Sequence, residues 1–469
     1  MFKTLKNAWR IPELKKKLLF TLLIVVLYRI GANIPVPYVD PSVFEGARDF
    51  TSGSILQFLN LLSGEALGKA TLLALGVSPY ITASIVIQLL TIAIPALERW
   101  SKDGENGRKK ITALTRIVTV ALALVTAIGY VIYLENGAGT GTTYLIGEVN
   151  FWQRAVMVLC FCAGAALVMW LAEKINESGI GNGISIILFA NILAGLPTMI
   201  MTVWTGVFTA GGFSGFRWQG LILAILEIAL LLGIIMLIVW MSDAERRIPI
   251  QYAKRVVGRK MYGGQNTNLP LKVNMAGVMP IIFANSIVAI PATIASFITN
   301  QENWFVKLIN GNWDFLETMS ENAPAGAGWL QSLLSFSYYS WPYLLIFLVL
   351  LIAFAFFYVM ISFNPIEVAN NIKNNGGAIP GIRSGRPTVD FIKKVLYRIT
   401  LVGALLVAFI ACFPMAVNII CSIPPISYQG FAALAFSGSS MMILVGVALE
   451  TIRELEAQMS LRNYKGFLD

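Results

Sequence analysis

Long apolar runs separated by short polar segments dominate the sequence. A helix that crosses a bilayer needs about 20 mostly apolar residues, and ten runs of this chain have roughly that length. They are residues 18–38, 72–95, 112–134, 152–174, 184–204, 219–241, 275–298, 341–362, 397–418 and 428–450. The pattern predicts an all-α polytopic membrane protein with ten transmembrane helices and with both termini on the same side.

The basic residues predict the orientation. Most of the 35 Lys and Arg residues lie in the N-terminal tail, in the loops that follow the even-numbered spans and in the C-terminal tail. Loops rich in Lys and Arg stay in the cytoplasm. We therefore expect both termini to be cytoplasmic.

The spans divide into two sets of five, residues 1–205 and 206–469. The second set must begin on the outer side of the membrane, so any internal repeat would be inverted. A short match supports such a repeat, because the second span contains Gly76-Val77-Ser78-Pro79 and the seventh contains Gly277-Val278-Met279-Pro280. We therefore expect two inverted five-helix halves.

A short amphipathic segment, residues 52–66, lies between the first two spans. Its apolar residues are Ile55, Leu56, Phe58, Leu59 and Leu62. A helix of about a dozen residues is about 18 Å long, too short for a hydrocarbon core of about 30 Å. It is either an interfacial helix on the outer leaflet or a re-entrant segment for which Gly53 and Gly64 act as hinges.

Charged residues are rare inside the spans, where Arg29, Glu173 and Glu227 are the clear cases. Ion-coupled carriers bind their ions through carboxylates near the midplane, so this pattern argues against them. The residues at mid-depth are instead aliphatic: Ile81, Ile85, Ile184, Leu188, Ile282 and Ile443. They either pack as ordinary core or lipid-facing side chains, or form a ring that closes a pore by excluding water.

Two large polar loops, 242–274 and 363–396, follow the sixth and eighth spans. Apolar and polar positions alternate over 246–253 and over 267–273, which predicts a long hairpin. In the second loop, Arg383 and Arg386 lie on a tip rich in Gly and Pro. Basic loops of this size suggest docking to an anionic partner, either protein carboxylates or nucleic-acid phosphates.

Composition narrows the function further. The chain is 57% hydrophobic and 13% charged, which excludes a soluble enzyme. It contains no histidine, which excludes Ser-His catalysis and His-ligated zinc or haem. We expect no metal, no cofactor and no catalytic residues. Because the sequence has no nucleotide-binding motif, any energy source would belong to a partner.

Four motifs carry a family resemblance: Gly179–Ile186, Arg247–Tyr252, Leu269–Val278, and Asn364-Pro365 followed by Pro380–Arg383. On these residues the chain resembles the SecY family, the central subunits of the bacterial protein-translocation channel. The resemblance covers nearly the whole length. It implies two halves that close like a clamshell around an hourglass pore in the cytoplasmic membrane. It also implies a lateral gate between the second and seventh spans, through which membrane segments leave sideways.

The resemblance assigns roles to residues that the patterns left open. Segment 52–66 matches the plug, and the six aliphatic residues match the pore ring, with Leu188 in place of a common isoleucine. The lateral gate would carry Ser84, Gln88 and Asn285. The loops would bind the motor ATPase SecA and the ribosome, including ribosomal RNA. Their docking residues would be Arg246, Arg247, Lys254, Arg255, Arg259, Arg383 and Arg386.

The other implied partners are the membrane subunits SecE and SecG, signal peptides, nascent polypeptides and the lipid bilayer. The competing hypothesis is a secondary solute transporter built from inverted repeats. It would need a charged or unwound site at the midplane, which the sequence does not show. The long external segment 299–340 receives no role from either the residues or the resemblance.

Overall fold

The computed structural model describes most of the chain. The described residues are 8–40, 60, 62–135, 145–147, 149–209, 218–252, 255–257, 260–262, 266–297, 341–421 and 437–465. Much of the predicted plug and the external segment 299–340 lie outside them.

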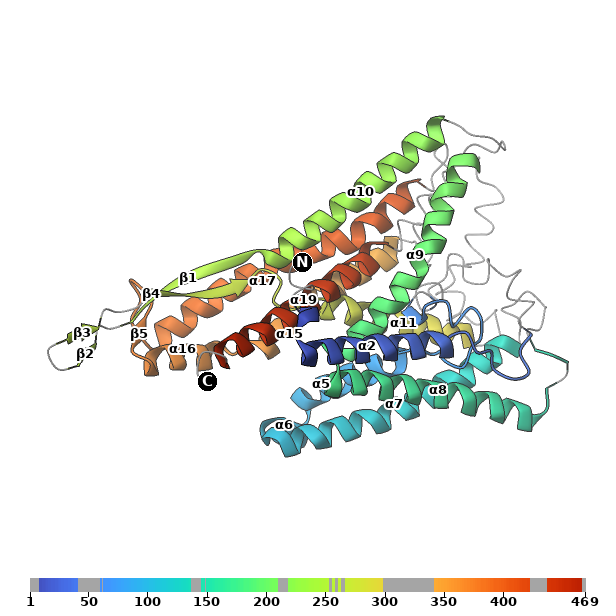
Figure 1. The fold of residues 1–469 in the computed structure, drawn as a ribbon, viewed down its shortest axis with the longest axis horizontal. Helices are drawn as coiled ribbons and strands as arrows, with labels where there is room; N and C mark the ends of the chain where they lie inside the picture. The colour runs from blue at the N-terminus through green and yellow to red at the C-terminus, as the bar shows by residue number, and fades with distance from the viewer. Residues whose placement is uncertain are drawn as a thin grey trace.

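A described helix overlaps each of the ten predicted spans (Figure 1). These helices are α2 (Pro12–Gly31), α5 (Ser78–Ala93), α7 (Gly104–Glu135), α8 (Phe151–Ser178), α9 (Gly183–Thr209), α10 (Trp218–Asp243), α11 (Met279–Phe297), α15 (Trp341–Ser362), α17 (Arg386–Cys421) and α19 (Ser437–Lys465). Within the described residues, five helices are by themselves long and apolar enough to cross a membrane. A bent helix pair brings the number to six.

The second span differs from its prediction at both ends. Residues 72–77 form turns rather than helix, and α5 begins at Ser78 with a proline in its first turn. The helix ends at Ala93 because Pro95 has no N–H to donate and forces Ile94 into an extended conformation. A second helix, α6 (Pro95–Lys102), then leaves at 102°.

The Gly-Val-x-Pro match corresponds to one local structure that occurs twice. Gly76 and Gly277 both have positive φ, +53° and +62°, which favours glycine. In each case a helix begins two residues after this glycine, α5 at Ser78 and α11 at Met279. The shared turn at equivalent positions supports the repeat, and the division at residue 205 stays a prediction.

Other helix ends depart from the apolar runs. α7 begins at Gly104, in a polar stretch that precedes its apolar run at residues 112–134. α17 likewise begins at Arg386, before its apolar run at residues 397–418. Both helices therefore extend beyond the apolar region. α2 instead ends at Gly31, and the chain then forms isolated bridges from Pro35 to Thr71 and from Val39 to Leu145. The described part of the last span begins only at Ser437.

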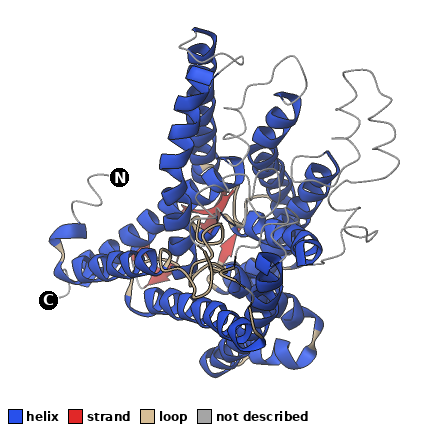
Figure 2. Cartoon of the chain, turned by 90° about the vertical axis from the view of Figure 1, so that its right-hand side faces the viewer, coloured by secondary structure: helices blue, strands red, loops and turns tan. Residues whose placement is uncertain are grey.

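The predicted hairpin is confirmed. Strand β1 (Glu245–Tyr252) pairs antiparallel with β4 (Asn266–Lys272), and β2 (Arg255–Val257) pairs with β3 (Lys260–Tyr262) nearer the tip. The hairpin projects from the helices (Figure 1), and the view in Figure 2 shows the few strands, in red, behind a largely helical bundle. The sequence did not predict that β5 (Gly377–Ala378), from the second loop, pairs with the end of β1. The helical fold therefore carries a small sheet that joins the two loops.

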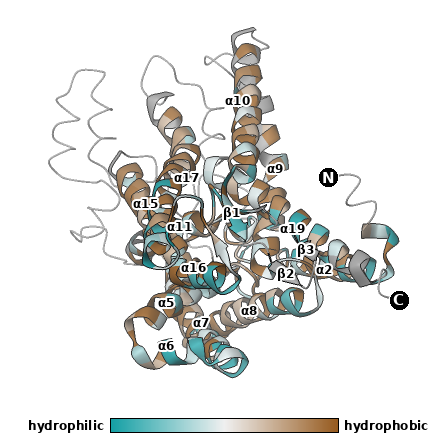
Figure 3. Cartoon of the chain, turned by 90° about the vertical axis from the view of Figure 1, so that its left-hand side faces the viewer, coloured by the Kyte–Doolittle hydropathy of each residue, from teal (hydrophilic) through white to brown (hydrophobic). Residues whose placement is uncertain are grey.

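Apolar residues, coloured brown, predominate along most of the long helices (Figure 3). On α10, for example, Ile225, Leu232, Met236 and Trp240 are more than half exposed, as expected for a lipid-facing surface. Inside, a continuous apolar cluster joins residues of both predicted halves. The helices of the two predicted halves therefore share one apolar core.

Candidate channel site

The six aliphatic residues of the predicted ring come from four helices. Ile81 and Ile85 lie on α5, Ile184 and Leu188 on α9, Ile282 on α11 and Ile443 on α19. Five of them are 1–7% exposed and belong to the central apolar cluster, and Ile184 is partly buried and packs against it. The structure thus brings residues from both halves into one core, as a pore ring requires.

Leu62 is the one predicted plug residue within the described part of the chain, and it is buried. Ile55, Leu56, Phe58 and Leu59 lie outside it. Residues 62 and 63 are helical and the helix stops at Gly64, which has φ of +69°. The helix therefore ends at Gly64, one of the two glycines that the sequence suggests as hinges.

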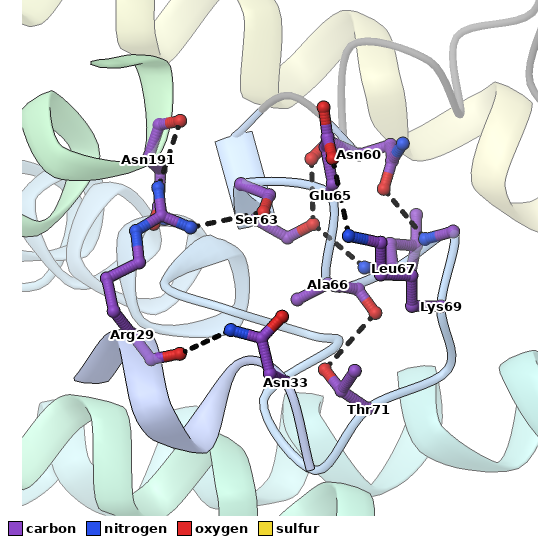
Figure 4. A network of polar contacts seen from close by, with 12 residues as sticks. Arg29, Asn33, Asn60, Ser63, Glu65, Ala66, Leu67, Lys69, Thr71 and Asn191 are labelled. Atoms are coloured by element: carbon purple, nitrogen blue, oxygen red, sulfur yellow. Dashed lines mark hydrogen bonds and ion pairs between the residues drawn. The ribbon is translucent and has the colours of Figure 1, made fainter. Parts of the chain in front are cut away.

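A polar network surrounds this helix end (Figure 4). Arg29 of α2 donates to the carbonyls of Gly64 at 3.2 Å, Ala190 at 2.5 Å and Asn191 at 3.3 Å. The amide of Asn191, on α9, donates to the Leu62 carbonyl at 2.6 Å and to the Tyr28 hydroxyl at 2.9 Å. The sequence drew attention to Arg29 only as a charge inside a span.

Tyr28 and Asn191 were missed at the sequence level. The available signal was Asn191 itself, a lone amide within the apolar stretch from Ile184 to Leu196. Such a residue inside a span requires polar partners, because lipid offers none. α2, which carries Tyr28, and α9, which carries Asn191, therefore meet at a polar site that contacts residues 62–64.

The predicted lateral-gate residues occupy different environments. The amide of Gln88, which is exposed, donates at 3.4 Å to the hydroxyl of Ser84 on the same helix, α5. Asn285 on α11 is 1% exposed, and its amide has no hydrogen-bond partner within the described structure. α5 and α7 both pack against α11. The structure therefore places the helices side by side without a direct polar bond across this seam among the three residues.

The basic loops form one structure, which we call the platform: β1, β4, β5, the helix α16 (Pro365–Asn374) and the start of α17. Its apolar core lies between the sheet and the helices, and comprises Ile248, Ile250, Leu271, Ala369, Ile372, Ile379, Ile392, Val395 and Ile399. The alternation of the strands thus buries one face against the second loop. The platform is a packed unit rather than two independent loops.

The predicted docking residues lie on the platform surface. Arg246 and Arg247 are exposed on β1, where Arg247 pairs with Glu245 at 2.6 Å. Arg383 is exposed on the loop before α17, between Gly381 and Gly385, which both have positive φ, and Arg386 is exposed at the first position of α17. Arg255 lies in β2, whereas Lys254 and Arg259 lie outside the described residues. No cluster of three or more Cys, Asp or Glu residues suited to a metal ion occurs in the described part of the chain.

Fold and site together define a helical, multi-pass membrane protein in which two sets of helices meet at an aliphatic core beside a basic platform. The SecY family model matches residues 71–452. The protein translocase subunit SecY of Streptomyces coelicolor is 41% identical over 479 residues and is matched over 100% of both chains. The chain therefore belongs to the SecY family and is a subunit of a protein-conducting channel in a membrane.

Other relatives agree. SecY of Bacillus licheniformis is 37% identical, with 100% of each chain covered. A solved structure described as a protein conducting channel has a TM-score of 0.56 at 18% identity and covers 96% of both chains. Sec61 in a canine ribosome-channel complex has a TM-score of 0.54 at 17% identity, again with 96% coverage. At these identities the two structures support the shared fold.

Proposed function

We propose that Ile81, Ile85, Ile184, Leu188, Ile282 and Ile443 form the constriction through which the polypeptide passes. The observation that carries this proposal is that side chains of both halves meet in one buried, uncharged cluster. An aliphatic constriction excludes water and ions when closed. It makes no hydrogen bonds that would select one polypeptide sequence over another, so it can yield to any unfolded chain. We assign no catalytic step to this chain.

We further propose that segment 52–66 is a plug that rests against this constriction. The location of Leu62 in the same buried cluster supports the assignment. A solved SecY of similar fold, with a TM-score of 0.57 and 19% identity, is described as having a plug domain that stabilises the closed state and maintains a membrane seal. The secondary-transporter hypothesis lacks comparable support, because no family match or fold relative favours it.

The lateral gate is proposed to lie where α5 and α7 meet α11. Polar side chains in the membrane contribute only about 0.6 to 2 kcal/mol each across a seam, so helices carrying Ser84, Gln88 and Asn285 can separate when a signal helix inserts between them. Released membrane segments would then move sideways into lipid.

The partners follow from the platform and from the relatives. We propose that the platform docks the motor ATPase SecA and the ribosome, on the cytoplasmic side where both termini lie. Its four exposed arginines and its packed core support this role, since a rigid basic surface suits an anionic partner. SecE and SecG are proposed as the accompanying membrane subunits. The canine Sec61 relative is described in a complex with the ribosome.

Resting conductance tests the constriction. Replacing both Ile81 and Ile282 with Asn in the reconstituted translocase should raise ion conductance in planar bilayers, because polar side chains hold water in the constriction. Val86→Asn is the matched control, since Val86 lies on the same helix but is 38% exposed. Unchanged conductance of the double variant, in correctly assembled protein, would overturn the assignment.

A further inference from the structure

The end of the proposed plug is held by side chains of two membrane helices. Three consecutive carbonyls, those of Leu62, Ser63 and Gly64, accept hydrogen bonds from Asn191 at 2.6 Å, from the Tyr28 hydroxyl at 3.4 Å and from Arg29 at 3.2 Å respectively. The first two belong to the end of a helix that stops at Ser63, and the Gly64 carbonyl belongs to the turn that follows it. Carbonyls at a helix end lack partners within the helix. Side chains from α2 and α9 supply these partners, and the guanidinium of Arg29 binds the first carbonyl after the helix.

Arg29 is an unusual residue at its position in α2. It is the one charged residue between Leu18 and Gly31, and a charge within an apolar span is costly unless it finds partners. Besides the Gly64 carbonyl, the guanidinium contacts the carbonyls of Ala190 and Asn191 on α9. It thus bridges the helix end at residues 62–64 to the middle of α9.

The absence of a side chain at Gly64 makes this contact possible. A Cβ at this position would lie 2.7 and 2.9 Å from the two terminal nitrogens of Arg29 and 2.9 Å from the amide oxygen of Asn191. Glu65 also has positive φ, +69°, so two successive residues in the left-handed region turn the chain sharply here. Only a glycine lets Arg29 and Asn191 approach the backbone this closely.

The chain on the other side of this turn is anchored differently. The Leu72 amide donates to the Ile34 carbonyl at 2.8 Å, the Val36 amide donates to the Ala70 carbonyl at 3.2 Å, and Tyr130 donates to the Leu67 carbonyl. Backbone pairing therefore fixes residues 70–72 to the segment that follows α2, and Tyr130 of α7 holds Leu67, whereas side chains of α2 and α9 hold residues 62–64. Contacts made by a few side chains can be released without unfolding the bundle.

We propose that Arg29, Asn191 and Tyr28 form a latch that holds the plug closed, and that the plug leaves the constriction by release of this latch at Gly64. The inference rests on the proposed function of segment 52–66. Within the described structure the amide oxygen of Asn191 is buried without a hydrogen-bond partner. The latch is thus incompletely satisfied even when closed, which limits its strength and suits a contact that must break.

The test combines latch variants with plug deletion in the full translocase in planar bilayers. Arg29→Gln and Asn191→Leu should each raise resting conductance, with an effect of roughly tenfold for Arg29→Gln, because a hydrogen bond to a charged group changes an equilibrium by about that factor. Both should also increase export of a precursor with a defective signal sequence. In a chain that lacks residues 54–64, the same substitutions should have no further effect. Gly64→Ala, which leaves α2 and α9 unchanged, should reproduce the phenotype.

The control is Asn33→Ala, because the exposed Asn33 side chain contacts only the Arg29 carbonyl among its hydrogen bonds in the described chain. Its conductance should equal that of the parent. If the deletion raises conductance but neither Arg29→Gln nor Gly64→Ala does, the latch proposal is wrong and the assignment of segment 52–66 as the plug is retained. If Arg29→Gln has an equal effect without the plug, Arg29 acts on the helix bundle and the latch is again wrong. If the deletion has no effect, the plug assignment itself fails.

Discussion

The two halves of the molecule meet along two seams that differ in how extensively their helices pack. At the first, which we call the gate seam, α5 and α7 pack against α11, and the seam carries Ser84, Gln88 and Asn285. At the second, the hinge seam, α9 packs more extensively against α10 and α19. Helices of both seams bury polar groups without hydrogen-bond partners in the described structure, for example Asn285 on α11 and Glu227 on α10. The seam that has less packing to lose should separate more easily.

The two helices against which α9 packs are also joined to each other, which makes the C-terminal side of the hinge seam more rigid. Arg453 of α19 donates to Asp243 at 2.6 Å and to the Ser242 carbonyl at 2.8 Å, which joins α19 to the end of α10. At the gate seam, the hydrogen bond of Gln88 stays within α5. The comparison teaches that an opening motion has a preferred side: the halves should part at α5 and α11 and pivot near α9.

The largest expected effect comes from closing one seam covalently. In a chain whose four cysteines are replaced by serine, a cysteine pair joined across α5 and α11 by a short thiol cross-linker should abolish translocation. The block should be reversed when the linker is cleaved. An equivalent bridge between α9 and α10 should leave translocation intact, as the pivot does not separate. Export into membrane vesicles measures both, and continued export with the gate bridge complete would contradict the gate assignment.

The second largest effect is expected for the affinity of the platform for its partner. If Arg383 inserts into an anionic pocket of a partner, Arg383→Glu loses a buried charge pair that is worth about 2 to 5 kcal/mol, which reduces affinity by at least about tenfold. Binding of SecA and ATP-driven export measure this loss. Arg108→Glu is the control, because Arg108 is an exposed residue at the start of α7 and contributes equally to the charge of its loop. If the Arg383 variant binds SecA normally and has the correct membrane topology, Arg383 does not dock the partner, and this loop only helps to set the orientation of the chain in the membrane.

A substitution at Asn285 sharpens the comparison between the seams. Its amide is buried without a partner in the described structure, and such a group costs about 1 to 3 kcal/mol. Asn285→Leu should therefore stabilise the closed gate seam by about 1 kcal/mol, raise the melting temperature and slow the insertion of a signal helix. Asn285→Asp, of the same size, should do the opposite. A lower melting temperature for Asn285→Leu would show that the amide has a partner in the membrane.

The sequence predicted the parts of this molecule whose signals are periodic. Hydropathy located all ten helices, and alternation located the hairpin of β1 and β4. The ends of helices were less predictable, because α5 depends on the two prolines Pro79 and Pro95, and α7 continues into polar residues where hydropathy gives no signal. The ring residues could be placed at one depth from the sequence, and their convergence from four helices depended on the resemblance.

What the sequence could not predict were contacts between segments far apart in the chain. The pairing of β5 with β1 involves only two residues on each strand, too few for a periodic pattern. Asn191 stands out as a lone amide in an apolar run, but the sequence does not show that its partners are Tyr28 and the helix end at Ser63. Such contacts are set by packing of the whole bundle rather than by local propensity.

The smallest expected effect tests whether the N-terminal half moves as one body when the gate seam opens. α7 and α8 are joined by ion pairs near both ends, Arg116 with Glu173 at 2.8 Å and Arg154 with Glu135 at 2.5 Å. Both arginine side chains are 50% exposed, so each pair should contribute less than about 1 kcal/mol. A double-mutant cycle of Arg116→Gln and Glu173→Gln, followed by thermal unfolding, should give a coupling of about 0.5 kcal/mol and leave resting conductance unchanged. If the substitutions also change the conductance, α7 and α8 move relative to each other when the gate seam opens. The N-terminal half would then not move as one body, and its rigid part would end at α8.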